Sequence, residues 1–95
     1  MTPEGRIQSY LKRRIAETGG HQRKLQWIGR RGAPDLFVWW DGPRLWFVEV
    51  KSETGRLSTL QELEIGRLRA SGFRVCVVDS MSAVDAFIAE AKETA

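Results

Sequence analysis

The sequence contains very little cysteine and histidine: one residue of each, Cys76 and His21, among 95. A single cysteine cannot form a disulfide within the chain, and it leaves too few thiolates for a structural zinc site. Cys76 lies in the apolar run 75–78, where a lone cysteine behaves as a small buried hydrophobic residue. Nothing in the sequence pairs His21 with a base or a nucleophile, so we expect it at the surface.

Long apolar runs are also missing. No stretch approaches the length of a transmembrane helix, the first residues show no signal-peptide pattern, and there are no repeats or low-complexity tracts. Together with the lone cysteine, these absences lead us to expect an intracellular protein in a reducing compartment, with no membrane partner.

The composition that remains, 42% hydrophobic and 28% charged, is typical of a globular protein. A chain of 95 residues is expected to form one domain, residues 1–95, with a modest core. The net charge is +3 and the sequence pI is about 9.5. This basic balance is compatible with a polyanionic partner, although many domains that bind none share it.

Two apolar runs dominate the middle of the chain, Leu36–Trp40 and Leu45–Val50. The turn signal Asp41-Gly42 lies between them, and this pattern predicts a β-hairpin. Residues two apart in a strand share a face, so the hairpin also fixes which side chains point the same way.

Charged residues gather at one end of this hairpin. Asp35 precedes the first run, and Glu49 and Lys51 close the second on a shared face. Charges near a core are costly unless they are paired or bind a metal. Two close carboxylates suit a hard divalent cation such as Mg²⁺, and a lysine beside them can hold or deprotonate a water. The set therefore indicates metal-assisted hydrolysis of a phosphodiester.

The N-terminal residues predict a helix over about Pro3 to Thr18, with Thr2 as its N-cap. Its inward stripe is Ile7, Leu11 and Ile15. Glu4 lies one turn before this stripe and so on the face expected to be buried. One interpretation is that Glu4 only complements the helix dipole; the predicted metal site nearby favours a third carboxylate ligand.

A first strand is predicted around Lys24 to Ile28, followed by a basic loop that leads into Asp35. The loop after the hairpin, from Ser52 to Leu57, carries one arginine, Arg56. We expect the arginines of these loops to contact phosphates, with ordinary solvated loops as the alternative: Arg30, Arg31 and Arg56.

Ser58 predicts the N-cap of a second helix that runs to about Ala70. Gln61, three residues on, could simply complete a capping box with Ser58. It also shares a stripe with Ile65, so it is equally placed to face inward from the first turn. Gly66 costs about 1 kcal/mol against alanine inside a helix, and we interpret it as a point of close packing against the sheet.

The continuous apolar run within Phe73 to Val78 predicts a strand in the interior of the sheet. Ser80 or Ser82 caps a last helix with apolar residues at helical spacing. The element order is therefore αβββαβα, an antiparallel meander followed by a crossover helix and a parallel strand. The fold class is α/β, with a mixed central sheet flanked by helices.

These residues resemble a known nuclease pattern. Pro34-Asp35 followed by Glu49-Val50-Lys51 resembles the PD-(D/E)XK nuclease superfamily. With Gly32-Ala33 before it and Gln61 after it, the pattern is more closely similar to the virus-type replication-repair nuclease (VRR-NUC) domain, from Glu4 to the last strand. The resemblance implies a restriction-endonuclease-like core. The short chain suits a stand-alone phage-type member acting in the cytoplasm of a bacterial or phage-infected cell.

The resemblance also implies roles for individual residues. It implies ligands for Mg²⁺ or Mn²⁺: Asp35, Glu49, the carbonyl of Val50, and Glu4 directly or through a water. Lys51 would position or activate the attacking water, and Gln61 would orient Lys51 or the scissile phosphate.

The activity implied is an endonuclease of the Holliday-junction resolvase type, acting on branched DNA as a symmetric homodimer. Trp39 and Trp40 are adjacent, and with Trp27 and Trp46 they favour an exposed aromatic patch at a dimer interface. The alternative is that all four are core or half-buried. The competing functions are a flap or single-strand nuclease, a catalytically silent DNA-binding domain, and a structural domain with a Glu49–Lys51 salt bridge.

Overall fold

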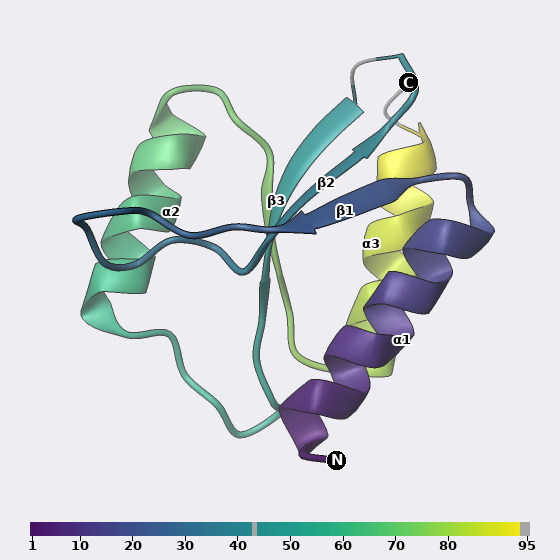
Figure 1. Ribbon diagram of the computed structural model, residues 1–95, viewed down its shortest axis with the longest axis horizontal. Helices are drawn as coiled ribbons and strands as arrows, with labels where there is room; N and C mark the ends of the chain where they lie inside the picture. Colours follow the sequence, from purple (N-terminus) through teal and green to yellow (C-terminus); the bar gives the residue numbers. More distant parts are fainter. Residues whose placement is uncertain (43, 94–95) are drawn as a thin grey trace.

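A four-stranded mixed sheet organises the chain. The computed structural model describes residues 1–42 and 44–93, and its strands lie in the order β1-β2-β3-β4 (Figure 1). The first two pairs are antiparallel and β3 pairs with β4 in parallel, so the predicted order and mixed sheet are confirmed. The elements are α1 (Pro3–Glu17), β1 (His21–Lys24), β2 (Leu36–Trp40), β3 (Arg44–Val50), α2 (Thr59–Ala70), β4 (Val75–Val78) and α3 (Met81–Glu93).

The predicted hairpin is confirmed, with Leu36 opposite Val48 and Trp40 opposite Arg44. Gly42 has φ +85°, a conformation that glycine adopts without strain, as a tight turn between strands requires. The second strand begins at Arg44, one residue earlier than predicted.

One face of the sheet carries the main core. Helices α1 and α3 pack against each other and cover this face (Figure 1). Alternate sheet residues point into it, as the period of two in a strand requires: Leu36, Val38, Trp40, Trp46, Val48 and Val50. The predicted stripe of α1 is buried here: Ile7, Leu11 and Ile15. Along the described part of the chain, no helix is both long and apolar enough to cross a membrane.

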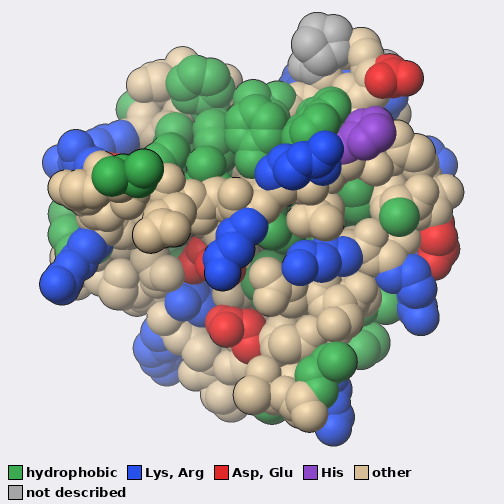
Figure 2. All heavy atoms as spheres, in the orientation of Figure 1, with side chains coloured by type: hydrophobic (Ala, Val, Ile, Leu, Met, Phe, Trp, Pro, Cys, Tyr) green, Lys and Arg blue, Asp and Glu red, His purple; other side chains and the backbone are tan. Residues whose placement is uncertain are grey.

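The opposite face is only partly covered. Helix α2 packs there over a smaller cluster built on Phe47, Ile65 and Val75. Trp39, on the outer part of this face, is half-buried and stacks on His21 with 5.2 Å between ring centroids. Figure 2 shows hydrophobic side chains gathered over this face beside α2.

The expected exposed patch of four tryptophans is wrong, and the alternative, that all four are core or half-buried, is confirmed. Trp40 is 3% exposed and Trp46 is 6% exposed, because both point into the face covered by α1 and α3. Trp39 and Trp27 are half-buried on the α2 side.

The first strand lies earlier than predicted, at His21–Lys24 instead of Lys24 to Ile28. Its partner β2 begins at Leu36, which pairs with Lys24. Because β2 has no residue before Leu36, the chain beyond Lys24 has no strand to pair with. Only the hydrogen bond from Leu25 N to Asp35 O (2.9 Å) continues the ladder. Residues 25–35 therefore form a long connection instead of a strand.

The prediction that the last strand is interior is also wrong. Among the described residues β4 is at the edge of the sheet, paired only with β3, and it starts at Val75 instead of Phe73. Its apolar run reflects helices on both faces, since α2 and α3 both contact it. The half-buried thiol of Cys76 lies here, and burial raises the pKa of this thiol to about 11.

Two glycines provide a test of the packing. Gly66 lies on the exposed side of α2, and a Cβ there would meet nothing within 4 Å, so its interpretation as a close-packing point is wrong. A Cβ at Gly20 would lie 2.7 Å from the Trp40 ring. We expect Gly66→Ala to raise the free energy of unfolding by about 0.5–1 kcal/mol and Gly20→Ala to lower it by about 1–3 kcal/mol, measured by urea denaturation. Changes of the same sign would contradict this packing.

Candidate metal-dependent active site

The site forms where the β2–β3 ladder ends. The N–H groups of even-numbered residues in β3 point toward β2. The first residue of β2 is Leu36, which lies opposite Val48, so the pairing does not reach Val50. Val50 N–H therefore has no strand partner, and it donates to Asp35 Oδ2 at 2.9 Å. This bond fixes the Asp35 carboxylate beside the last residues of β3, the strand that carries Glu49. The predicted approach of Asp35 to the end of β3 is confirmed.

Glu49 is buried, with 1% of its surface exposed. Its Oε2 accepts from Gln61 Nε2 at 2.7 Å and lies 3.5 Å from Lys51 Nζ. Its Oε1 has no hydrogen-bond partner within the described residues. Burial, and next the charge of Asp35, raises the pKa of Glu49 to about 7, while Lys51 acts in the opposite direction. A buried carboxylate oxygen without a donor is costly, so this atom is poised to take a cation or a proton.

Gln61 both completes the capping box and faces inward to Glu49, so the two placements considered from the sequence occur together. Its Oε1 accepts from Ser58 N at 2.8 Å, and its own N–H donates to Ser58 Oγ at 3.1 Å, which completes a capping box. The side-chain Nε2 of Gln61 donates to Glu49 Oε2. The start of α2 is thus tied to the end of β3 through one side chain.

Glu4 does not face inward as expected. Its side chain is exposed at the first turn of α1, which extends past the buried stripe that begins at Ile7. Across residues 1–42 and 44–93, no three His, Cys, Asp or Glu side chains are grouped closely enough to hold a metal ion. The structure therefore unites two carboxylates, Asp35 and Glu49, and leaves Glu4 outside the pair. The N-terminal turn of α1 still borders the loop after Lys51, because Pro3 and Ser52 line one hollow.

The three predicted phosphate-binding arginines behave differently. Arg31 and Arg56 are exposed, and neither has an ion pair within the described residues. Arg30 instead binds Glu64 through two bonds of 3.0 and 3.4 Å.

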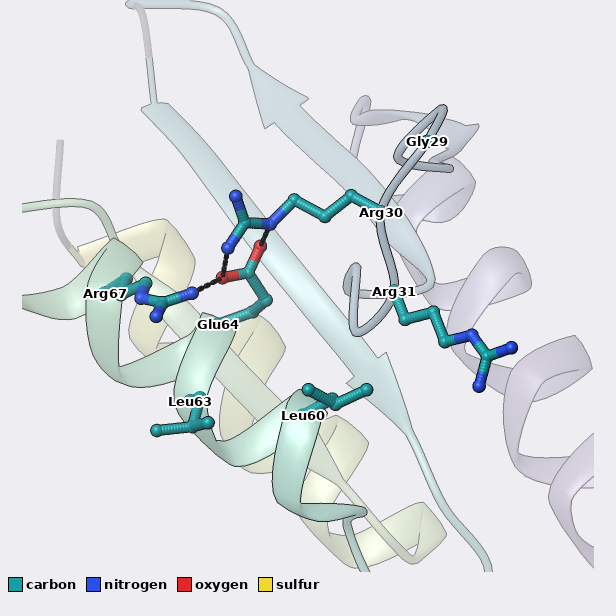
Figure 3. A pocket seen from close by; sticks show the side chains of 7 residues that line it. All are labelled: Gly29, Arg30, Arg31, Leu60, Leu63, Glu64 and Arg67. Atoms are coloured by element: carbon teal, nitrogen blue, oxygen red, sulfur yellow. Dashed lines mark hydrogen bonds and ion pairs between the residues drawn. The ribbon is translucent and has the colours of Figure 1, made fainter.

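Glu64 is a residue that the sequence reasoning missed. It is 8% exposed, and besides Arg30 it accepts from Arg67 at 2.9 Å. Figure 3 shows both guanidinium groups converging on it while Arg31 points away. The hydrogen bond from Arg67, with the charge of Arg30, holds the pKa of Glu64 below its usual value. The i, i+3 spacing from Gln61 to Glu64 to Arg67 was the available signal.

Comparisons with known proteins identify the family of this chain. The VRR-NUC domain matches residues 4–82 of the chain. The chain belongs to the VRR-NUC family. A solved structure named "VRR_NUC domain" superposes on this VRR-NUC chain with a TM-score of 0.88 at 45% identity, covering 93% of this chain and 96% of that one. The "Putative nuclease p44" of Acyrthosiphon pisum secondary endosymbiont phage 1 is 35% identical over 77 residues, 81% of this chain and 83% of that protein.

The two tasks of Gln61 can be separated. Ser58→Ala removes only the cap, so we expect it to lower the free energy of unfolding by about 1 kcal/mol and to leave the Glu49 contact intact. Gln61→Ala keeps the bond from its backbone N–H to Ser58 Oγ but loses the return bond from Ser58 N. It also removes the hydrogen-bond donor of a buried carboxylate, which we expect to cost a further roughly 1–3 kcal/mol. Chemical denaturation of both variants in EDTA measures the difference. Equal losses would show that the contact to Glu49 contributes nothing to stability.

The buried carboxyl predicts an unusual pH dependence in EDTA. Folded Glu49 keeps its proton up to about pH 7, whereas the unfolded group releases it near its ordinary value of 4.5. The folded state then binds more protons between these values, so stability falls as pH rises through this window, by up to about 3 kcal/mol.

Glu49→Gln supplies the control, because it removes this titration while keeping the shape. We expect the difference in unfolding free energy between the two proteins to change in favour of the variant from about pH 4.5 to 7 and then to level off. Parallel pH profiles would contradict a raised pKa at Glu49.

Proposed function

We propose that this VRR-NUC chain is a metal-dependent endonuclease that hydrolyses phosphodiester bonds of DNA. The observation that carries the proposal is the buried Glu49 beside Asp35, with one carboxylate oxygen left without a donor. A salt bridge alone does not account for this oxygen, because Lys51 approaches the other one. Membership of the VRR-NUC family and the similarity to a phage protein named as a nuclease support the same conclusion.

The donors at the site fit a hard divalent cation. Asp35, Glu49 and the backbone carbonyl of Val50 are oxygen donors at one end of the sheet, the ligand type that Mg²⁺ and Mn²⁺ prefer. Such an ion, when bound, supplies polarisation of the phosphate and lowers the pKa of a bound water. Glu4, exposed at the start of α1, would contribute through a water.

The protein's own residues would do the remaining work. The Lys51 side chain is 19% exposed, so its ammonium group can meet both the buried carboxylate and a substrate phosphate. There it would hold the attacking water or offset charge that develops on the phosphate. Gln61 would keep Glu49 oriented, and through it Lys51.

Branched DNA is the proposed substrate, and two copies of the chain the proposed active form. The partly covered sheet face around Phe37 and Trp39 supports a dimer, since exposed apolar surface of this kind suits an interface. A twofold dimer would present two sites to a symmetric four-way junction. Arg31 and Arg56 are exposed and available for phosphates. The place of action would be inside the cell, where such DNA arises.

Cleavage assays test the proposal. We expect nicking of a four-way junction with Mg²⁺ or Mn²⁺ and none with EDTA. Lys51→Ala is expected to reduce the rate constant at least 100-fold, because it removes a group in contact with the reacting atoms, while its circular dichroism spectrum stays that of the wild type. The readout is single-turnover kinetics on end-labelled DNA.

The substrate panel separates the competing functions. Symmetric nicks in the junction support a resolvase, whereas cutting confined to flaps or single strands supports the alternative nuclease. Binding without cutting under every metal condition would support a silent binding domain. Cleavage that survives EDTA would overturn the metal-dependent mechanism.

A further inference from the structure

The connection between β1 and β2 runs across α2 and projects past it (Figure 1). Its tip carries an exposed apolar side chain, Ile28. Ile28 is 97% exposed, more than any other large hydrophobic side chain in the described residues. Gly29 follows with φ +76°, the left-handed conformation that turns the chain back. Leaving a branched aliphatic side chain entirely in water forgoes its burial energy. A single exposed aliphatic residue is common on protein surfaces, so the groups around Ile28 decide whether the tip belongs to a binding surface.

This tip is held firmly against the protein. Trp27, directly before Ile28, packs into the apolar cluster under α2. Arg30 is bonded to Glu64 on α2. A Cβ at Gly32 would lie 2.6 Å from the carbonyl oxygen of Leu60, so loop and helix are in direct backbone contact there. The residues on both sides of Ile28 are therefore anchored to the body of the protein, which holds Ile28 in a defined position.

The surface beside the tip combines apolar and basic groups. A hollow of about 430 Å³ lies between the loop and α2, with Leu60 and Leu63 on its helix side (Figure 3). Three arginines line the same hollow: Arg30, Arg31 and Arg67. The one carboxylate among them, Glu64, has both oxygens bonded to Arg30 and Arg67. Three guanidinium groups against one carboxylate leave the hollow with a net positive charge, and Arg31 has no acidic partner among the described residues. Apolar surface next to net positive charge fits nucleobases and phosphates better than the apolar face of a protein partner.

We propose that Ile28 is a wedge that inserts between base pairs at a branch point or distorted step of DNA, with Arg31 and Arg30 against the flanking phosphates. Aliphatic side chains inserted in this way unstack bases and bend the duplex. Steps already weakened by a branch open at the lowest cost. This inference rests on the proposed function, and it explains how a chain of this size would select branched DNA.

The chain length between wedge and site limits where the cut falls. Ile28 precedes Asp35 by seven residues, which span at most about 25 Å. That distance corresponds to roughly seven base pairs of B-form DNA. Cleavage should therefore lie within about seven nucleotides of the unstacked step.

Fluorescence of 2-aminopurine measures the wedge without cleavage. We would place the base at the centre of a four-way junction and add protein carrying Lys51→Ala, with Ca²⁺ in place of Mg²⁺. Saturating protein should raise the fluorescence at least threefold, as unstacking relieves quenching. Ile28→Ser should abolish the rise, whereas Ile28→Leu, which keeps an aliphatic side chain, should retain it. The near-complete exposure of Ile28 means that both variants should keep the thermal midpoint of the parent protein.

Cleavage and sedimentation complete the test. With Mg²⁺ and an intact Lys51, Ile28→Ser should lower the preference for junction over linear duplex at least tenfold. A fluorescence rise without any cleavage would reject the proposed nuclease function and leave the wedge standing. Cleavage without a rise, or a rise that survives Ile28→Ser, would overturn the wedge. A switch from dimer to monomer in Ile28→Ser, with fluorescence unchanged, would instead assign the tip to a contact between copies.

Discussion

The structure of the site depends on burying the Glu49 carboxyl beside Asp35. Removing a carboxylate from water is costly, and the protein compensates only one of its two oxygens, with Gln61 and Lys51. The other oxygen has no donor within the described residues. Without a bound ion, the protein therefore keeps a buried carboxyl oxygen that lacks a positive or donating partner at the end of β3. That oxygen is the physical basis for assigning a cation to this position.

Helix α2 links this carboxyl to the rest of the fold. Its first turn reaches Glu49 through Gln61, and its next turn holds the loop before Asp35 through Glu64 and Arg30. The helix therefore fixes the relative placement of both carboxylates. Its register against the loop is set by Gly32, where the backbone of the loop touches that of the helix. Small shifts of α2 would alter the site from both sides.

The sequence allowed the hairpin and the convergence of Asp35, Glu49 and Lys51 to be predicted, because strand periodicity and a short turn determine which ends meet. It could not determine burial that depends on distant elements. Glu4 lies on the same side of its helix as the inward stripe, but the helix extends beyond the core at that turn, so Glu4 is exposed. The apolar run of β4 indicated an interior strand, whereas covering helices on both faces produce the same pattern.

The state of Cys76 has a practical consequence for work on this protein. Its thiol is half-buried and has a pKa near 11, so at neutral pH almost none of it is the thiolate that reacts with alkylating reagents. A cysteine introduced on the surface would therefore react far faster than the native one. Spin labels or fluorophores can be attached at chosen positions without first removing the natural residue.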